Sequence, residues 1–244
     1  MHKEYVRLVD TADTAVLFIH GIVGTPNHFT DFVNLVPSEM SVCNMLLDGH
    51  GKGVSEFSKT SMDKWKSQVD AKVTELSKTH SKIIIVAHSM GTLFAINESV
   101  KHPDKIQKLF LLATPLKLFI KPQMMLNTMK VYFGLIKDSD KMAQAAQRAY
   151  GIKDSKNIFK YIGWIPRYLE LFKEIKAVRK SVPLISTPCD VYQSAHDEMV
   201  SVKSTNILNK NNNIRVNVLA KSSHYYYDDD DYKYLLNEFS DFIQ

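Results

Sequence analysis

Short apolar runs recur along the chain, and each has the length and side-chain types of a buried β-strand. The stretches between them show helical spacing, with apolar positions three and four residues apart. The predicted strands cover residues 15–19, 42–47, 82–87, 109–113, 191–193 and 214–219, and the predicted helices cover residues 62–78, 91–101, 204–209 and 232–243. This alternation predicts an α/β fold with a mostly parallel central sheet and helices on both faces.

The segment from residue 115 to residue 183 departs from this alternation. It contains two or three amphipathic helical stretches and no convincing strand. Between Lys117 and Lys180 there are fourteen Lys and Arg residues against five Asp and Glu, a local net charge of +9 in a chain whose formal net charge is +5. We interpret residues 115–183 as an insertion with its own surface character, between the core segments 1–114 and 184–244.

Composition narrows the class of protein. Of the 244 residues, 45% are hydrophobic and 10% aromatic, which is enough for a sizeable core and excludes wholesale disorder. No apolar run reaches about 18 residues, so we expect no transmembrane helix, and the first residues lack a secretory signal. Cys43 and Cys189 lie in apolar runs and are expected to be buried thiols of a reduced, cytoplasmic protein. No nucleic-acid motif accompanies the basic segment, so we expect no nucleic-acid partner.

The sharpest motif is Val86–Gly91, which places Ser89 between a predicted strand and a predicted helix. This is the context of the nucleophile elbow G-x-S-x-G, with Ala87 in place of the first glycine. A tight strand-to-helix turn exposes the serine hydroxyl, and small residues two positions before and after it avoid a clash. The helix N-terminus then points at the site, so the N–H of Met90 is a candidate oxyanion donor. The alternative is an ordinary serine N-cap.

A loop after the first predicted strand supplies a second candidate donor. A serine hydrolase of this kind needs another N–H from such an early loop, and we assign it to Ile22 within Phe18–Gly24. His20 in the same loop is interpreted as a structural histidine that hydrogen-bonds the loop. Six of the nine glycines lie between Gly21 and Gly91, where backbone must turn sharply or approach something closely.

Serine catalysis also needs a base. Downstream of Ser89, histidine occurs only at positions 102, 196 and 224. His102 is expected at an exposed helix end, whereas His196 and His224 lie in loops after predicted strands. His224 follows the last predicted strand, in the chain order Ser, acid, His that α/β-hydrolases use, so we assign it as the base.

The base in turn needs an orienting carboxylate. Asp197 lies in a loop at the carboxyl end of a predicted strand, where open α/β sheets place their ligands. Asp190 is a rival acid but begins its strand and so belongs to the opposite edge of the sheet, and Glu198 is a rival one residue away. The predicted catalytic set is therefore Ser89, Asp197 and His224.

Taken together, these motifs resemble the α/β-hydrolase superfamily, and more narrowly the bacterial carboxylesterases and monoacylglycerol lipases. The resemblance spans the chain from about residue 14 onward and is most branch-specific in His196–Val200. It implies an α/β-hydrolase fold with a helical cap inserted at residues 115–183, oxyanion donors at Ile22 and Met90, and no metal or organic cofactor. Haloalkane dehalogenases and epoxide hydrolases share the fold but place an aspartate at the elbow, so Ser89 argues against both.

The inserted segment bears on the substrate. It contains nine of the 25 aromatic residues and four methionines, which suit an acyl pocket but also simple packing. Its basic charge favours either an anionic membrane surface or headgroup, or only a solvated helix face. The candidate substrate contacts are His20, Gly21, His88, Met124, Trp164 and Met199.

The sequence thus predicts a serine esterase acting on short- to medium-chain acyl esters, including monoacylglycerols, as its small-molecule substrates. The alternatives are a lysophospholipase or thioesterase using the same triad, and a non-catalytic ligand-binding member of the fold. The sequence does not predict the oligomeric state.

Overall fold

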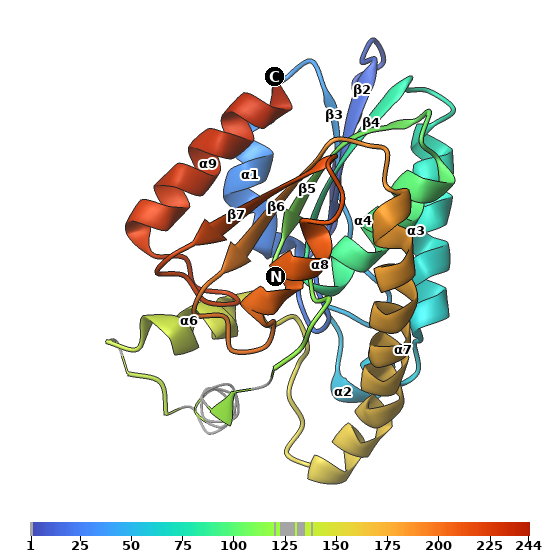
Figure 1. Cartoon of the computed structure of the whole chain (residues 1–244). Coiled ribbons are helices and arrows are strands. Elements are labelled where there is room, and N and C mark those ends of the chain that lie inside the picture. Colours follow the sequence, from blue (N-terminus) through green and yellow to red (C-terminus); the bar gives the residue numbers. More distant parts are fainter. Residues whose placement is uncertain (1, 120, 123–129, 131–134, 138) are drawn as a thin grey trace.

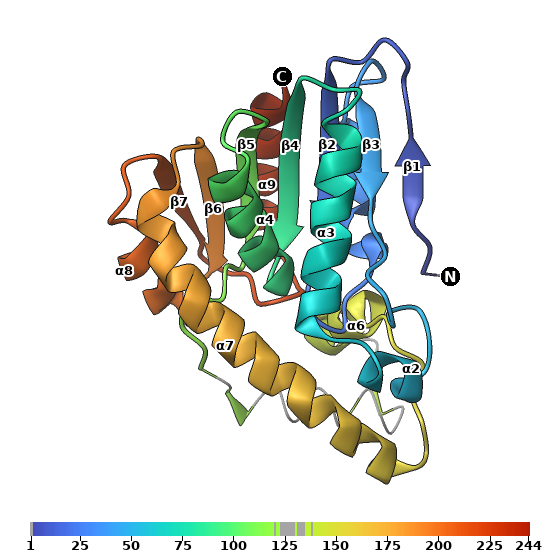
Figure 2. The ribbon, with the colours of Figure 1, turned by 90° about the vertical axis from the view of Figure 1, so that its right-hand side faces the viewer.

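The computed structural model describes residues 2–119, 121–122, 130, 135–137 and 139–244. Seven strands of this part of the chain form one sheet in the order β1-β3-β2-β4-β5-β6-β7 (Figures 1 and 2). The strands are β1 (Tyr5–Arg7), β2 (Thr14–Ile19), β3 (Ser41–Asn44), β4 (Lys82–His88), β5 (Ile106–Leu112), β6 (Cys189–Ser194) and β7 (Ile214–Leu219). All neighbours are parallel except β1, which is antiparallel to β3. The predicted mostly parallel sheet is confirmed.

Strand β4 lies between β2 and β5 and places the predicted nucleophile at the centre of the sheet. Its register with β2 pairs Phe18 with Val86 and Ile19 with Ala87, so the two strands end at the same edge. The residues that follow them, His20 and Ser89, therefore leave the sheet side by side. Alternate residues of both strands face opposite sides, which is why the buried runs are apolar at every position.

Helices cover both faces of the sheet, as predicted (Figures 1 and 2). Helices α3, α4, α7 and α8 pack on one face, and α1 and α9 on the other. The α-helices are α1 (Thr30–Leu35), α2 (Val54–Ser58), α3 (Met62–Leu76), α4 (Met90–Lys101), α6 (Lys141–Ala149), α7 (Ile165–Ser181), α8 (Thr205–Leu208) and α9 (Asp229–Ile243). Short 3₁₀ helices are η1 (Pro26–Phe29), η2 (Ile158–Trp164), η3 (Val182–Leu184) and η4 (Val202–Ser204). No helix in the described ranges is long and apolar enough to cross a membrane.

The acidic run near the C-terminus begins the last helix. Asp228 is the N-cap of α9, and its carboxylate accepts a hydrogen bond from the Asp230 N–H at 3.3 Å. Three further carboxylates occupy the first turn, where their negative charge interacts favourably with the positive end of the helix dipole. The helix predicted for residues 232–243 therefore begins three residues earlier, at Asp229.

The described part of segment 115–183 contains α6, η2, α7 and η3. Helix α7 lies beside α3 and α4 in one layer (Figure 2) and packs there through Leu171, Ile175 and Val178. Just before α7, the Trp164 ring lies 4.7 Å from the Phe57 ring, and its indole N–H donates to a backbone carbonyl at 3.3 Å. The end of the segment is thus built into the helical layer of the core, while the domain boundaries stay a prediction.

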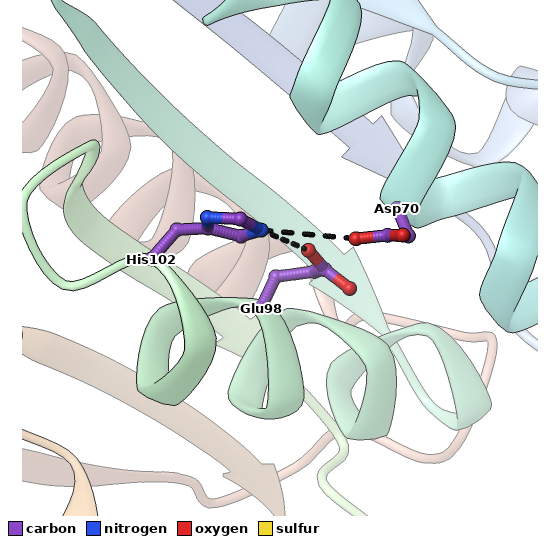
Figure 3. A group of neighbouring side chains, drawn as sticks. All are labelled: Asp70, Glu98 and His102. Carbon is purple, nitrogen blue, oxygen red and sulfur yellow. Dashed lines mark ion pairs between the residues drawn. The ribbon is translucent and has the colours of Figure 1, made fainter.

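His102 differs from the expectation of an exposed side chain. It does end α4, but its side chain is only 28% exposed, because Asp70 of α3 and Glu98 of α4 enclose it (Figure 3). The Nε2 atom of His102 lies 3.7 Å from a carboxylate oxygen of each. This cluster joins α3 to α4, and the sequence-based expectation of exposure is wrong.

Candidate active site

Ser89 occupies a strained turn between β4 and α4. Its φ of 52° and ψ of −122° lie outside the regions that L-residues favour, and α4 begins at the next residue, Met90. The turn is held by its backbone, since the Ser89 N–H donates to the Leu112 carbonyl at 2.8 Å and the Thr92 hydroxyl donates to the Ser89 carbonyl at 2.7 Å. The Ser89 side chain is therefore free of the helix-capping role, and no side-chain cap bond is formed.

Two glycines allow the loop after β2 to touch this turn. A Cβ atom on Gly91 would lie 2.2 Å from the Ile19 carbonyl oxygen, and one on Gly21 would lie 2.9 Å from the Ser89 Cβ. Both distances are too short for real side chains, so glycine is required for the close approach. The loop after β2 and the start of α4 consequently meet at the serine, with Ile22 next along the loop.

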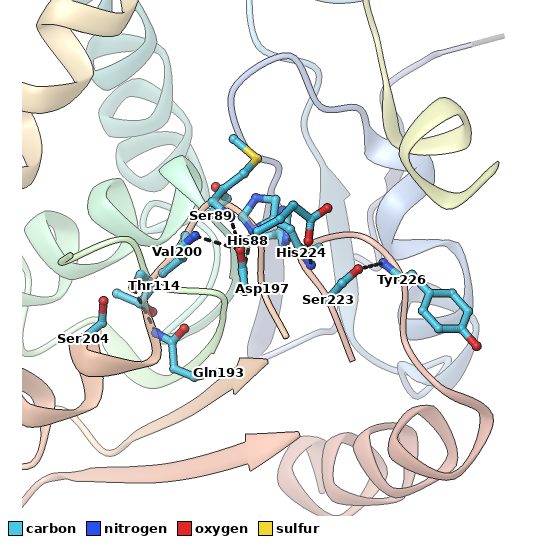
Figure 4. Close-up of polar contacts among 12 residues, drawn as sticks. His88, Ser89, Thr114, Gln193, Asp197, Val200, Ser204, Ser223, His224 and Tyr226 are labelled. Atoms are coloured by element: carbon cyan, nitrogen blue, oxygen red, sulfur yellow. Dashed lines mark hydrogen bonds and ion pairs between the residues drawn. The ribbon is translucent and has the colours of Figure 1, made fainter. Parts of the chain in front are cut away.

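The predicted acid and base lie together. The Nδ1–H of His224 donates to the Oδ2 atom of Asp197 at 2.7 Å, and both side chains are buried (Figure 4). The other oxygen of Asp197 accepts the N–H groups of Met199 and Val200 at 2.7 Å each. These bonds fix the carboxylate, and the carboxylate fixes the tautomer and orientation of the ring.

Neighbouring side chains hold the His224 backbone. The Nε2–H of His88 donates to the His224 carbonyl at 3.0 Å, and the His224 N–H donates to a Glu198 carboxylate oxygen at 3.2 Å. Glu198, the rival acid, thus holds the main chain of His224 and not its ring. Among the described residues, the Nε2 atom of His224 is buried with no hydrogen-bond partner.

Charge around His224 favours its protonated form. Burial lowers the pKa of the imidazole, but the charge and hydrogen bond of Asp197, together with the charge of Glu198, outweigh burial and raise the pKa above its ordinary value of 6.5. A basic imidazole with one free nitrogen is suited to accept a proton from a hydroxyl.

The other rivals lie apart from this cluster. Asp190 lies near the start of β6 and forms a bidentate ion pair with Arg215, at 3.0 and 2.6 Å. His196 is exposed to solvent. The position of Asp190 agrees with its expected place at the opposite edge of the sheet, whereas the exposure of His196 was not predicted.

His20 is used by the fold. Its Nε2 atom accepts the Leu47 N–H at 3.1 Å, so the proton resides on Nδ1, which donates to the Gly21 carbonyl at 2.9 Å. Burial lowers the pKa of His20 to about 4, which keeps the ring neutral. Both ring nitrogens are occupied, in agreement with a structural histidine and leaving none for a substrate.

The remaining candidate contacts occupy different places. Gly21 and His88 border Ser89, whereas Trp164 packs on Phe57 of α2. Met199 is partly buried beside Asp197, and Met124 lies outside the described residues.

Two aromatic neighbours of His88 and His224 were not predicted from the sequence. The His28 ring lies 4.1 Å from the His88 ring, and the Tyr225 ring lies 4.7 Å from the His224 ring. Burial, followed by the charges of other histidines, lowers the pKa of His28 to about 3. Tyr225 had a local signal, its place next to His224. His28 had none, because its contact with His88 exists only in the folded chain.

A groove of about 780 Å³ opens beside the cluster, between α6, η1 and the loop that precedes α9. Its walls include His28, Tyr225 and Arg148, but Ser89 and Asp197 do not line it. We therefore do not assign the groove as the place where the reacting bond of a substrate would lie.

One described cluster has the residue types of a metal site. Ligand atoms of Asp70, Glu98 and His102 lie within 4.8 Å of one another (Figure 3). However, the Lys101 ammonium is hydrogen-bonded to the same Asp70 oxygen that faces His102. The cluster is a network of polar contacts that joins two helices. It lies on α3 and at the far end of α4, away from Ser89.

Comparison with protein families identifies the class. The family model described as serine aminopeptidase, S33, matches residues 10–229. The match includes Ser89, Asp197 and His224 and almost the whole sheet, and the chain belongs to this family of α/β-hydrolases. It is a hydrolase of that class. No curated protein matches the sequence.

Solved structures agree on the fold. A structure reported with LipS and LipT, two metagenome-derived lipolytic enzymes, has 17% sequence identity and a TM-score of 0.76, and the alignment covers 99% of this chain and 97% of that one. The monoacylglycerol lipase of Paleococcus ferrophilus has 14% identity and a TM-score of 0.70, with coverages of 99% and 98%. Est1E from Butyrivibrio proteoclasticus, bound to ferulic acid, has 18% identity and a TM-score of 0.68, with coverages of 99% and 93%.

Proposed function

We propose that this chain is a serine esterase in which Ser89 is the nucleophile, His224 the base and Asp197 the orienting acid. The N–H groups of Ile22 and Met90 are the proposed oxyanion donors. Met90 is the first residue of α4, so its N–H is beyond the reach of the helix's own carbonyls and is available to a ligand. The proposed substrates are short- to medium-chain carboxylic esters, including monoacylglycerols.

The reaction follows from these roles. The Ser89 Oγ attacks the ester carbonyl carbon while the His224 Nε2 takes the hydroxyl proton, and the carbonyl oxygen becomes an oxyanion held by the two N–H groups. Collapse of this intermediate breaks the bond to the alcohol, which receives the proton from His224. Water then attacks the acyl carbon while His224 takes one of its protons. Collapse of this second intermediate breaks the bond to the Ser89 Oγ, which receives the proton from His224 as the acid leaves.

One observation is central to the proposal. The buried His224 ring has Nδ1 committed to Asp197 and Nε2 without a partner, in a site where Ser89 is held at a positive φ. An imidazole with one nitrogen held by a carboxylate and the other without a partner can accept a proton from a hydroxyl, which supports His224 as the base. A serine that merely capped α4 would need no such base.

Labelling and turnover test the proposal together. The wild type is incubated with a fluorophosphonate probe and with p-nitrophenyl esters of increasing acyl length. Ser89→Ala should abolish labelling and turnover, whereas Ser99→Ala, a change at a buried serine farther along the same helix, should retain both. Absence of labelling and turnover in the wild type would overturn the esterase proposal.

The same panel separates ester from amide hydrolysis, since the family description includes an aminopeptidase. Aminoacyl p-nitroanilides are measured beside the esters. We expect the esters to be hydrolysed faster than the anilides. The acyl length that gives the highest kcat/KM then indicates the length of the acyl pocket. Faster turnover of the anilides would replace the esterase proposal with a peptidase.

A further inference from the structure

Six large apolar side chains are exposed along η2 and α7. Their exposed fractions range from 46% to 73%, although such residues are ordinarily buried. We call them the apolar stripe: Ile158, Phe159, Ile162, Ile165, Leu169 and Phe172.

The spacing places the stripe on one side. In α7, positions 165, 169 and 172 follow intervals of four and three residues, the repeat of a single α-helical face, and in the 3₁₀ helix η2 the interval of three places positions 159 and 162 on one face. The opposite side attaches α7 to the core, through Leu171, Ile175 and Val178. Arg167 adds hydrogen bonds to the carbonyls of Ser58 and Thr60. The stripe thus faces away from the core, and its side chains do not contribute to core packing.

The charges beside the stripe are of one sign. Lys160, Lys173, Lys176 and Lys180 are exposed on the same elements. The two acids of α7 are engaged elsewhere. Glu170 pairs with Arg167, and Glu174 is buried against Lys66 and Asn97. The outer side of η2 and α7 therefore combines apolar and cationic side chains without an exposed acidic counterpart among their described residues.

We propose that the apolar stripe and its lysines dock the protein on an anionic lipid bilayer. Apolar side chains at the acyl boundary and cations at the headgroups are the combination that interfacial helices use. This inference rests on the proposed function, since a lipid bilayer is a source of ester substrates. A second copy of the chain fits less well, because pairing two such faces brings cations together without acids to neutralise them.

Vesicle flotation tests the docking. The Ser89→Ala protein is mixed with vesicles of phosphatidylcholine alone or with about 30% phosphatidylglycerol. We expect co-flotation with the anionic vesicles that weakens as salt is raised. Combined Phe159→Ser, Ile162→Ser and Phe172→Ser should reduce binding at least tenfold. Combined Lys173→Glu, Lys176→Glu and Lys180→Glu should remove the preference for anionic vesicles.

The matched control changes exposed apolar residues elsewhere. Leu184 and Val218 are 64% and 51% exposed, outside the stripe, so Leu184→Ser with Val218→Ser should float like the parent. Thermal melting of every variant shows that it is folded. The proposal is overturned if folded parent protein binds neither vesicle, if the stripe variant binds as well as the control, or if the stripe instead supports a dimer in sedimentation.

The experiments distinguish failure of the docking proposal from failure of the esterase proposal. Turnover of a soluble p-nitrophenyl ester by wild-type protein, without flotation, would overturn docking and leave the esterase intact. Flotation without turnover of any ester would support the surface and overturn the esterase proposal.

Discussion

The Nδ1 atom of His224 lies 2.7 Å from the Oδ2 atom of Asp197, and neither side chain is exposed to solvent. The second oxygen of Asp197 is occupied by two backbone N–H groups. The ring can thus present only Nε2 to a reactant. This pairing distinguishes Asp197 from Glu198, whose carboxylate bonds the main chain of the same histidine.

Replacing the two adjacent acids should have different results. Asp197→Asn should lower kcat on the order of 10,000-fold, because an amide can donate to Nδ1 and stabilise the wrong tautomer of His224. Glu198→Gln keeps an oxygen for the His224 N–H and should retain most of the activity. Steady-state kinetics with p-nitrophenyl esters compares them. Equal losses in both variants would contradict the assignment of the acid.

The pH dependence of kcat/KM should report His224. The base must be neutral to accept the Ser89 proton, so the rate should rise with pH through an inflection above 6.5, because the pKa is raised by Asp197 and Glu198 against burial. In Asp197→Asn the charge is lost and burial dominates, so the inflection should move to lower pH. Profiles from about pH 5 to about pH 9 measure both. An unmoved inflection would show that another group titrates.

The parts that sequence could predict are those with local signals. The strand, serine, glycine and helix of the elbow are contiguous, so the turn at Ser89 was predictable from six residues. Strand β1 has no such signal, since it is a three-residue edge strand with exposed Tyr5 and Val6 that exists through its pairing with β3.

Contacts between distant segments were not predictable. Asp70 encloses His102 from another helix, and His28 of η1 meets His88 at the end of β4. Periodicity shows which face of a helix is buried, but it does not show which neighbour lies there. The exposure of the apolar stripe was hidden for the same reason, because its spacing also fits packing on the sheet.

Gly91 should be intolerant of a side chain. In Gly91→Ala the new Cβ meets the backbone carbonyl of Ile19, which cannot move without β2, so we expect a loss of about 3 kcal/mol in unfolding free energy and lower kcat. Gly53→Ala meets only the flexible Glu56 carboxylate, at 3.0 Å, and should cost less than about 1 kcal/mol. Urea unfolding measures the difference. Similar unfolding midpoints would contradict the close approach.

Glu98 should make stability depend on pH. Burial, helped by the charge of Asp70, raises the pKa of Glu98 to about 7. Because the folded chain retains this proton when the unfolded chain has lost it, the unfolding free energy should fall as pH rises from about 4.5 to about 7. Glu98→Gln removes this pH dependence, and at higher pH its unfolding free energy should exceed that of the wild type by about 1 kcal/mol. Lys101 and solvent screen the Glu98 charge and keep the difference this small.

The matched change is Glu75→Gln on α3, at a side chain 60% exposed, where solvent screens its ion pair with Lys72, so the unfolding free energy should stay within about 0.5 kcal/mol of that of the wild type. Thermal or urea unfolding at several pH values measures all three proteins. If Glu98→Gln and wild type differ by the same amount at low and high pH, the buried carboxyl does not titrate as described.

The place of α7 in the helical layer limits which residues between β5 and β6 this chain could exchange without disturbing its sheet. Strands β5 and β6 are parallel neighbours, so the chain that leaves the carboxyl end of β5 must return to the opposite edge before β6 begins. Helix α7, at 17 residues, is the crossover that makes this return. Shortening or exchanging the segment between β5 and α7 would therefore leave the sheet intact only for residues up to about 164. Even before α7 the chain is tied to the core at Gly151 and Lys153, whose N–H groups donate to the carbonyls of Val23 and Lys52 at 2.7 Å each, so an exchanged segment would have to replace these bonds as well.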